Sequence, residues 1–557
     1  MAEQMHPPPR ASQQRSTGRL SRRAMLAGTV GATAAIGLGA AGCTPGDAGE
    51  SGGNGERGGA KAVLPNYVPY TGVEPTYPAE VARTSAAFAE YPAEPPRYAE
   101  NPPGNGQPVT FMGPTSFAMP PVLADNPFWQ EMNARAGSPL DIQLTPAGEY
   151  DAKFATSVAG GQLPDMFYVG SMASLPEFLA ADAADLTDHL SGDAINDYPA
   201  LANIPSDAWR GCMFGGRIRT LPLHRGLISL PSILVREDLL AGQGMSVTDV
   251  DSFETLYSMS KELTGGDQVA WTNVPLGYIR SMLDIPQTWT LDEDGRLGTS
   301  LEDERHEQAL EAARRLVADK VVVPDYASTP TANRKLAFGS GTRIFHPDSF
   351  IAWFSLYVQH ERVPGIEIQV LPMAGFDGGQ GTQALSSGIG GRSAINIKAG
   401  DRIADLLRIA DWLAAPVGTE EYLFNKYGIA GRHYNLDGTD PIPTEQNHEV
   451  NIGSLYLCDA ARAIYSPGRP DTVRSAWEHQ QSVTGKAMAD PTYGLYSETG
   501  ARKLPTLDRK LSDTVDSIIA GRQPVSAWQG AVQTFLNDGA TTVLEEYQAD
   551  LDANPPE

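Results

Sequence analysis

The stretch YDAKFATSVAGGQLPDMFYV, residues 150–169, decides the fold class. Its first half predicts a helix over 150–158, because apolar residues recur one turn apart and two glycines follow them. Its second half predicts a buried strand over 166–169. Strands are also expected at 109–112 and 140–144, separated by a helix that begins with Asn and Pro. This succession predicts a parallel sheet whose ligands bind at the carboxyl ends of its strands.

The rest of the chain continues this alternation and is too long for one core. About 450 residues follow position 105, which exceeds the usual size of a single hydrophobic core, so two lobes are expected. We assign 106–226 to the first lobe and 227–390 to the second. Residues 391–557 are assigned to segments that return to both lobes and to C-terminal helices. The predicted fold is α/β, with two lobes and a helical C-terminal portion.

The first 42 residues predict an export signal. Ser21-Arg22-Arg23 precedes an uncharged run of Gly and Ala, which is the pattern of twin-arginine export. Ala40-Ala41-Gly42 stands directly before Cys43 like a lipobox, so cleavage would leave a lipidated cysteine as the mature N-terminus. A plain transmembrane anchor is the alternative, because the run is about 19 residues long, but it is only weakly hydrophobic. The expected location is the outer face of the cytoplasmic membrane.

Residues 43–105 predict a flexible tether that starts at the lipidated Cys43. The segment is rich in Gly at first and then in Pro and Glu. Such a composition buries too little apolar surface to offset the entropy of the chain. A tether of this kind would hold the folded lobes away from the membrane.

Composition and motifs exclude several classes of function. The chain has 42 basic and 67 acidic residues, a net charge of −25, which argues against nucleic-acid binding. No serine-hydrolase elbow and no zinc-binding pattern occurs, so neither a metal nor another cofactor is predicted. Asp292-Glu293-Asp294-Gly295 lacks the full calcium-loop frame and predicts a hairpin turn. Cys212 and Cys458 could form a disulfide or remain two buried thiols.

Three blocks carry a resemblance to a known family. They are the helix-to-strand passage 150–165, the segment 216–240 with its Gly-Arg-Ile-Arg-Thr-Leu-Pro start, and NKYGIAGRHY at 425–434. In this order behind a lipobox, they resemble the extracellular solute-binding lipoproteins of ABC importers, family 1, in the large subgroup that binds sugars and oligosaccharides. The resemblance implies a periplasmic-binding-protein-like fold of class II type, which binds sugar between its lobes and delivers it to a membrane permease. It also implies a monomer without enzymatic activity or catalytic residues.

Sugar sites stack aromatic rings on apolar sugar faces and place charged or amide groups around the hydroxyls. The ligand-binding candidates are therefore aromatic and polar residues of expected loops and strand ends: Phe117, Tyr168, His224, Arg225, Trp271, Trp289, Asp348, Trp353 and Asp377. Each tryptophan could instead pack in a core or a lobe interface. Arg225 could instead pair with a carboxylate across the hinge.

Two other functions compete with transport. A secreted, lipid-anchored carbohydrate-active enzyme, a hydrolase or a lyase, would need two carboxyl groups about 5–10 Å apart beside a sugar site. A surface adhesion lipoprotein would need no small ligand at all.

Overall fold

The computed structural model describes residues 62–80, 84–172, 174–226, 232–360 and 363–553. The predicted signal of residues 1–42 and the lipidation site Cys43 lie outside these ranges. Within them, no helix has both the length and the apolar composition needed to cross a membrane.

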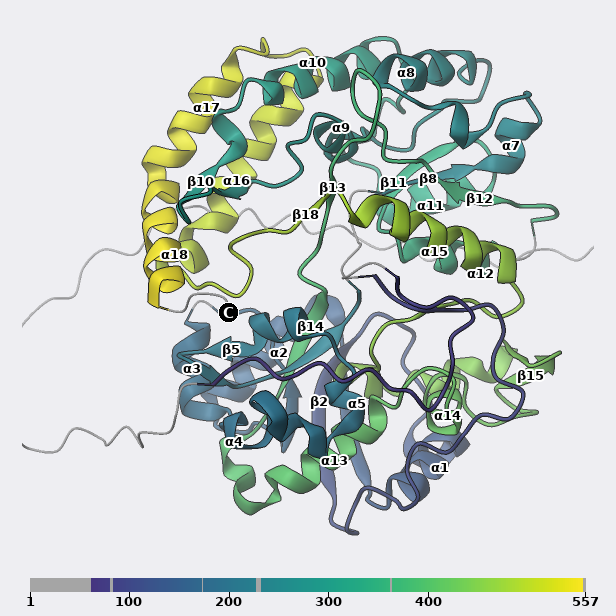
Figure 1. Cartoon of the computed structure of the whole chain (residues 1–557), viewed down its shortest axis with the longest axis vertical. Helices are drawn as coiled ribbons and strands as arrows, with labels where there is room; N and C mark the ends of the chain where they lie inside the picture. Colours follow the sequence, from purple (N-terminus) through teal and green to yellow (C-terminus); the bar gives the residue numbers. More distant parts are fainter. Residues whose placement is uncertain (1–61, 81–83, 173, 227–231, 361–362, 554–557) are drawn as a thin grey trace, which may run out of the picture. The chain divides into compact units, whose positions relative to one another are not determined.

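A five-stranded mixed sheet forms the centre of the first lobe (Figure 1). Its order is β3 (Leu140–Pro146), β2 (Val109–Thr115), β4 (Met166–Tyr168), β14 (Ile389–Ile395) and β7 (Leu221–His224). Strand β2 is parallel to β3 and β4, whereas β14 is antiparallel to β4 and β7. The predicted parallel unit is therefore confirmed, and its two connecting helices are α1 (Pro127–Ala136) and α2 (Ala147–Ala159).

Helices cover both faces of this sheet. One face packs on α2 and α3 (Leu175–Asp182), where Phe154, Phe167 and Phe178 meet. The other packs on α1 and α13 (Ile403–Leu413) and forms a larger core. Shorter helices complete the lobe: α4 (Thr187–Leu190), α5 (Pro199–Ala202), α6 (Ser206–Trp209) and α14 (Glu420–Tyr427).

The second lobe is built on a three-stranded antiparallel sheet. Its order is β11 (Phe345–Asp348), β8 (Ser232–Arg236) and β12 (Ile368–Val370). Around it lie α7 (Glu237–Ala241), α8 (Phe253–Glu262), α9 (Leu276–Met282), α10 (Arg305–Ala318), α11 (Thr331–Gly339), α12 (Ala352–Gln359) and α15 (Pro470–Thr484). The chain thus leaves the first sheet at β7, builds the second lobe, and returns to the first sheet at β14.

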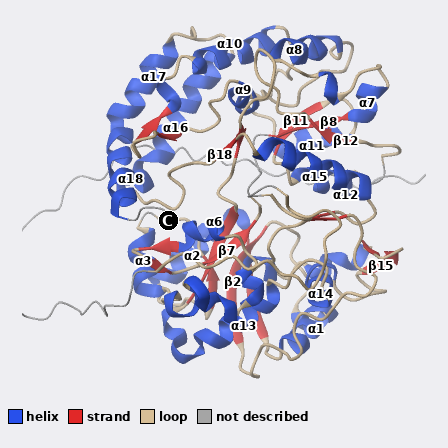
Figure 2. Cartoon of the chain, viewed as in Figure 1, coloured by secondary structure: helices blue, strands red, loops and turns tan. Residues whose placement is uncertain are grey.

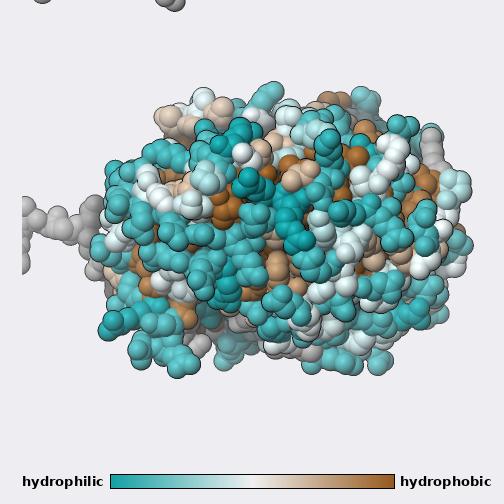
Figure 3. Space-filling view, turned by 90° about the horizontal axis from the view of Figure 1, so that it is seen from above, coloured by the Kyte–Doolittle hydropathy of each residue, from teal (hydrophilic) through white to brown (hydrophobic). Residues whose placement is uncertain are grey.

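The helical C-terminal portion belongs to the second lobe. It consists of α16 (Glu498–Ile519), α17 (Ala527–Phe535) and α18 (Thr541–Ala553), which share a core with α10 and with the hairpin of β9 (Trp289–Leu291) and β10 (Leu297–Thr299) (Figure 2). The turn of that hairpin contains Asp292–Gly295, as predicted. Seen from the side that carries α8 and α10, the surface is mostly hydrophilic and its hydrophobic residues are scattered (Figure 3).

The described part of the predicted tether is ordered against both lobes, which corrects the prediction for residues 62–80 and 84–105. We call these residues the N-terminal strap; they are dark purple in Figure 1. The strap contacts the first lobe at Val68, whose N–H donates to Ala202 O, and then the second lobe, where Tyr77 stacks on Trp477. Its strand β1 (Ala87–Phe88) pairs in parallel with β17 (Ile464–Tyr465).

The strap then returns to the first lobe, where Tyr91 is buried. The composition argument fails because it averages over the segment. A few anchoring aromatic residues bury enough surface to hold an otherwise polar, Pro-rich chain, whose backbone groups bond to the lobes.

Both cysteines of the lobes are buried free thiols, which excludes the disulfide alternative. Burial raises the pKa of Cys212 to about 11, and it also raises the pKa of Cys458.

Candidate functional site

Three predicted site residues lie at one edge of the first sheet. Strands β2, β4 and β7 all run in the same direction, because β14 is antiparallel to both β4 and β7. Phe117 follows β2, Tyr168 ends β4 and Arg225 follows β7. Phe117 is 51% exposed, whereas Tyr168 and Arg225 are half-buried. The topology thus brings them to the carboxyl edge, where α/β sheets bind ligands.

Two glycines of β14 let Tyr168 and Arg225 lie directly against the backbone. A Cβ added to Gly390 would stand 2.9 Å from Arg225 Cγ. A Cβ added to Gly391, which has φ +153°, would stand 2.4 Å from Tyr168 Oη. The register against β7 also shifts by one residue between Ile389 and Arg392. Glycines and a bulge in a central strand are typical of a place where side chains are redirected.

Tyr168 belongs to a group of three tyrosines. Its ring is edge-on to Tyr150, with centroids 5.6 Å apart, and edge-on to Tyr456, with centroids 5.9 Å apart. Tyr150 Oη donates to the backbone oxygen of Tyr168 at 2.6 Å, which fixes the end of β4. Burial is the main cause of the raised pKa of Tyr168, so its hydroxyl stays protonated and able to donate. Among the described residues, the hydroxyls of Tyr168 and Tyr456 have no hydrogen-bond partner.

Arg225 is held in place by a buried carboxylate. Its Nη1 lies 2.6 Å from Asp459 Oδ2, and Lys426 pairs with the other oxygen. Burial alone would raise the pKa of Asp459, but Lys426 and Arg225 lower it to about 2. Arg225 follows β7, where the chain leaves the first lobe, and Asp459 follows Cys458, where it leaves that lobe again. The ion pair therefore joins two segments that cross between the lobes.

His224 has a structural role, which corrects its assignment as a ligand residue. It is buried, and its Nδ1 accepts a hydrogen bond from Arg462 N at 2.8 Å. Burial and the nearby Arg462 and Arg225 lower the pKa of His224 to about 3, so the ring is neutral. It joins β7 to the segment that leads back to the second lobe.

The three predicted tryptophans lie in the core of the second lobe, which contradicts a stacking role on ligand. Trp271 is 0% exposed, stacks on Phe345 and donates from Nε1 to Ser260 Oγ at 2.8 Å. Trp353 is 1% exposed and donates to Ile368 O at 2.7 Å. Trp289 is buried beneath the C-terminal helices. Their N–H groups donate to residues of the same lobe, or their rings pack on its aromatic residues. The sequence placed these tryptophans after strands or in loops and did not show these contacts.

The two predicted acidic residues also lie away from the sheet edge of the first lobe. Asp348 ends β11 and pairs with Lys335 at 3.0 Å and with His346 at 3.2 Å. Burial would raise the pKa of Asp348, but these partners and Ser349 N–H outweigh it and hold the pKa below its ordinary value. Asp377 is exposed in a turn.

Sequence reasoning missed Arg392, Tyr456 and Tyr493. Arg392 is on β14, half-buried, with its guanidinium 5.4 Å from the ring centroid of Phe214. Tyr493 comes from the second lobe, in the loop before α16, and donates to Ala208 O of the first lobe at 3.1 Å. Burial raises the pKa of Tyr493, and the charge of Arg392 offsets part of this effect. An added Cβ at Gly211 would stand 2.6 Å from Tyr493 Oη, so Tyr493 and Arg392 both contact the segment 211–214. The sequence feature that could have pointed to Arg392 is the pair Gly390-Gly391 directly before it, because paired glycines in a strand indicate a close approach of side chains.

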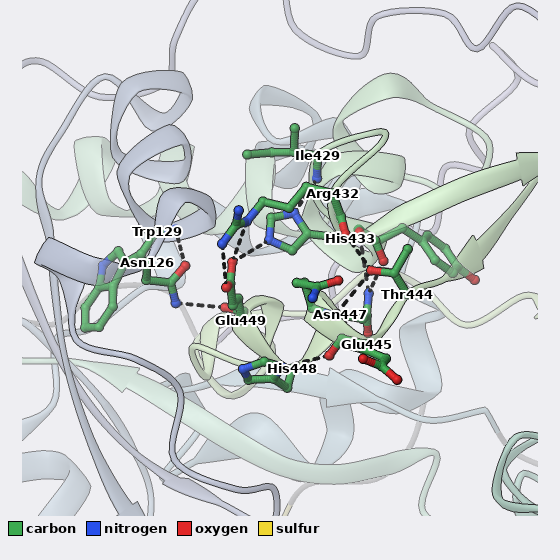
Figure 4. A network of polar contacts seen from close by, with 12 residues as sticks. Asn126, Trp129, Ile429, Arg432, His433, Thr444, Glu445, Asn447, His448 and Glu449 are labelled. Atoms are coloured by element: carbon green, nitrogen blue, oxygen red, sulfur yellow. Dashed lines mark hydrogen bonds and ion pairs between the residues drawn. The ribbon is translucent and has the colours of Figure 1, made fainter.

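The third block of the sequence resemblance folds into a structural network (Figure 4). Gly428 has φ +85°, and a Cβ there would meet His433 Nδ1 at 2.7 Å. His433 Nδ1 accepts from Ile429 N, and its Nε2 lies 3.0 Å from Glu449 Oε2. Arg432 binds the same carboxylate through two nitrogens at 2.7 and 2.8 Å. This motif therefore fixes a turn of the first lobe.

Within the described residues, no group of three or more His, Cys, Asp or Glu side chains is arranged to hold a metal ion. The carboxyl edge instead offers aromatic rings, free tyrosine hydroxyls and guanidinium groups. Such groups bind by stacking and hydrogen bonding.

Comparison with known proteins identifies the fold. No protein-family model matches the chain, and no curated protein sequence matches it. Among solved structures, it is similar to the N-glycan transport solute-binding protein NgtS of Streptococcus pneumoniae, with 16% identity and a TM-score of 0.58 over 80% of this chain and 98% of that one.

Two further structures agree. The substrate-binding protein FusA of an S. pneumoniae ABC transporter, in complex with kestose, has 14% identity and a TM-score of 0.59 over 80% of this chain and 99% of that one. An HMO-binding solute-binding protein of Bifidobacterium longum infantis has 11% identity and a TM-score of 0.58 over 81% and 100%. The chain therefore has the two-lobed fold of ABC-transporter solute-binding proteins, as predicted.

Proposed function

We propose that this chain is the substrate-binding component of an ABC importer and captures a sugar or oligosaccharide between its two lobes. The observation that carries the proposal is the fold, because nearly the full length of three sugar-transport solute-binding proteins superimposes on this chain. The sheet edge supports it independently. Tyr168 and Tyr456 offer ring faces and unused hydroxyls there, which are the groups that recognise the apolar faces and the hydroxyls of a sugar.

The proposed motion is a hinge between the lobes. The chain passes between them twice in the N-terminal strap, then after β7, before β14, and again between Cys458 of the first core and Ile464 of the second. Bending at these crossings would close the second lobe over the carboxyl edge of the first sheet. A closed, loaded form would then dock on a membrane permease. No covalent step is involved, so no catalytic residue is needed.

We further propose that the chain acts as a monomer outside the cell membrane, exported by the twin-arginine route and anchored by lipid on Cys43. The sequence of residues 1–43 is the support for export and anchoring. Labelling of growing cells with radioactive palmitate tests it: the intact chain should incorporate label, and C43A should not. Replacement of both arginines by lysine, R22K with R23K, should abolish export.

Thermal unfolding of a soluble chain that begins at residue 62 tests sugar binding. A ligand present at 100 times its Kd adds about 2.7 kcal/mol to the free energy of unfolding, which is a clear rise in Tm. We expect such a rise with one class of oligosaccharide, recovered unchanged afterwards. Recovery of a cleaved product would support the carbohydrate-active enzyme instead, and a flat response to all sugars would contradict the proposed function.

A further inference from the structure

Positive charge gathers at the carboxyl edge of the first sheet, in a chain whose net charge is −25. Arg225, Lys426 and Arg462 surround the single carboxylate of Asp459. Arg225 lies against Gly390 and the Tyr168 hydroxyl lies against Gly391, and Arg392 directly follows these two glycines. We call Arg225, Arg392, Lys426 and Arg462 the cationic edge. Of the carboxylates in this part of the lobe, Asp459 pairs with Arg225 and Lys426, and Asp151 accepts a hydrogen bond from Ser171 N at 3.0 Å.

Within the described residues, two members of the cationic edge, Arg392 and Arg462, make no side-chain hydrogen bond or ion pair. Arg462 is exposed to solvent, whereas Arg392 is half-buried. Arg225 and Lys426 are committed to Asp459. Arg392, by contrast, has neither an ion pair nor a side-chain hydrogen bond within the described residues, and it only faces the ring of Phe214. A guanidinium carries five N–H donors in a planar fork, and this fork matches an oxyanion in two places at once.

The backbone of β14 fixes the position of Arg392 through two glycines and a bulge. Arg392 follows Gly390 and Gly391, at the point where β14 gains one residue against β7. An arginine on the central strand of a sheet would ordinarily need an acceptor or open solvent. The backbone oxygen of Arg392 accepts from Val169 N at 2.9 Å, one residue after Tyr168, and its guanidinium faces Phe214. Phe214 follows Gly211, where an added Cβ would stand 2.6 Å from the hydroxyl of Tyr493, a residue of the second lobe. Arg392 therefore lies where the two lobes meet.

We propose that the ligand is an anionic oligosaccharide, and that Arg392 binds its carboxylate or sulfate group while Tyr168 and Tyr456 contact the sugar ring. This inference rests on the proposed function and narrows it to one class of sugar. A neutral sugar would leave Arg392 without an acceptor in a closed interface, which costs free energy. An oxyanion would satisfy it and would also offset the positive charge of the cationic edge.

The test uses the chain that begins at residue 62 and four oligosaccharides of similar length. Tetragalacturonate carries carboxylates, a κ-carrageenan tetrasaccharide carries sulfates, a chondroitin sulfate tetrasaccharide carries both, and galactotetraose is neutral. Binding is measured by isothermal titration and by the rise in Tm. We expect binding to at least one anionic probe, weaker binding at raised ionic strength, and no binding to the neutral one. The carboxylate and sulfate arms identify which oxyanion is recognised.

Variants assign the effect to Arg392. R392Q is expected to weaken the binding of the anionic probe about 10- to 100-fold, the range for hydrogen bonds to charged groups, with an apo Tm close to that of the original chain. R392K keeps the positive charge but loses the planar guanidinium, so its affinity for the anionic probe should lie between those of R392Q and the original chain. The matched control is R509Q, which removes the same charge from an exposed position on α16 and should leave affinity unchanged.

Each result has a distinct meaning. Binding of the neutral sugar alone, or anionic binding that R392Q does not weaken, overturns the anionic specificity and leaves the proposed function intact. Silence for every anionic probe, with a response to other neutral sugars, overturns it equally. Silence for all sugars counts against the proposed function and, with it, against this inference.

Discussion

The hydroxyl of Tyr98, in the N-terminal strap, donates a hydrogen bond to the buried carboxylate of Asp411 on α13. The other carboxylate oxygen accepts from the backbone N–H groups of Ala200 and Leu201 at 2.8 and 3.0 Å. Burial nevertheless outweighs these hydrogen bonds and raises the pKa of Asp411 from 3.8 to about 6. One carboxyl group thus joins the strap, α5 and α13. Its ionisation in the folded state costs free energy, so its contribution to stability depends on pH.

Because of Asp411, the free energy of unfolding should fall as the pH rises from about 4 to about 6. The pKa in the folded state lies above the unfolded value, so this contribution is fully present below about pH 4 and is lost as the pH passes about 6. The difference corresponds to about 3 kcal/mol. D411N should remove this part of the pH dependence of the free energy of unfolding, measured with urea. D401N, at an exposed position before the same helix, should leave it unchanged; parallel curves for D411N and the original chain would contradict the assignment.

Glu449 should have the opposite pH dependence. Hydrogen bonds from Arg432, supported by His433, lower the pKa of Glu449 to about 2 against the effect of burial. Its contribution is therefore present above about pH 4.5 and lost as the pH falls toward 2. E449Q should lower the free energy of unfolding at pH 7 by about 1–3 kcal/mol, because it removes the charged acceptor shared by the exposed Arg432 and the buried ring of His433. The exposed E445Q on the same turn is the control, and an equal loss from both variants would rule out the network as the cause.

The N-terminal strap should stabilise both lobes. Asp440 Oδ1 accepts hydrogen bonds from Tyr91 N and from Tyr465 Oη, both at 2.8 Å. The N-terminal strap and β17, which follows the crossing to the second lobe, therefore meet at one carboxylate. Y91A should lower the free energy of unfolding by about 3–5 kcal/mol, as for other buried aromatic residues. Y67A, at an exposed tyrosine of the same strap, should change it by about 0.5 kcal/mol or less.

A chain that begins at residue 106 should melt well below one that begins at residue 62, because it lacks the whole strap. Differential scanning calorimetry compares the two. Equal melting temperatures would mean that the strap contributes no net stability and would restore the tether as the description of these residues.

The sequence predicted the parallel part of the first sheet because its strands are local and periodic, with helices between them. It could not place β14, since a strand that arrives from more than 200 residues away carries no local sign of its neighbours. The site followed the same division. Tyr168 could be placed at the sheet edge from the sequence because it ends β4 of the local unit. Arg225 and Arg392 reach the same edge only through β14, which pairs with β7. The tryptophans were misassigned because position after a strand does not indicate whether an indole N–H points to solvent or, as in Trp271, to Ser260.

Trp353 and Tyr168 should separate stability from binding. W353F removes a buried N–H that donates to Ile368 O and leaves a small cavity, so it should lower the free energy of unfolding by about 1–3 kcal/mol and leave sugar affinity unchanged. Y168F removes only a hydroxyl without a partner among the described residues. It should leave stability nearly unchanged and weaken sugar binding about 2- to 10-fold, the loss of one neutral hydrogen bond. Affinity measured by titration calorimetry, beside Tm, decides between them: if W353F abolished binding at an unaltered Tm, the ligand would lie on the second lobe, and the sheet edge would lose its assignment.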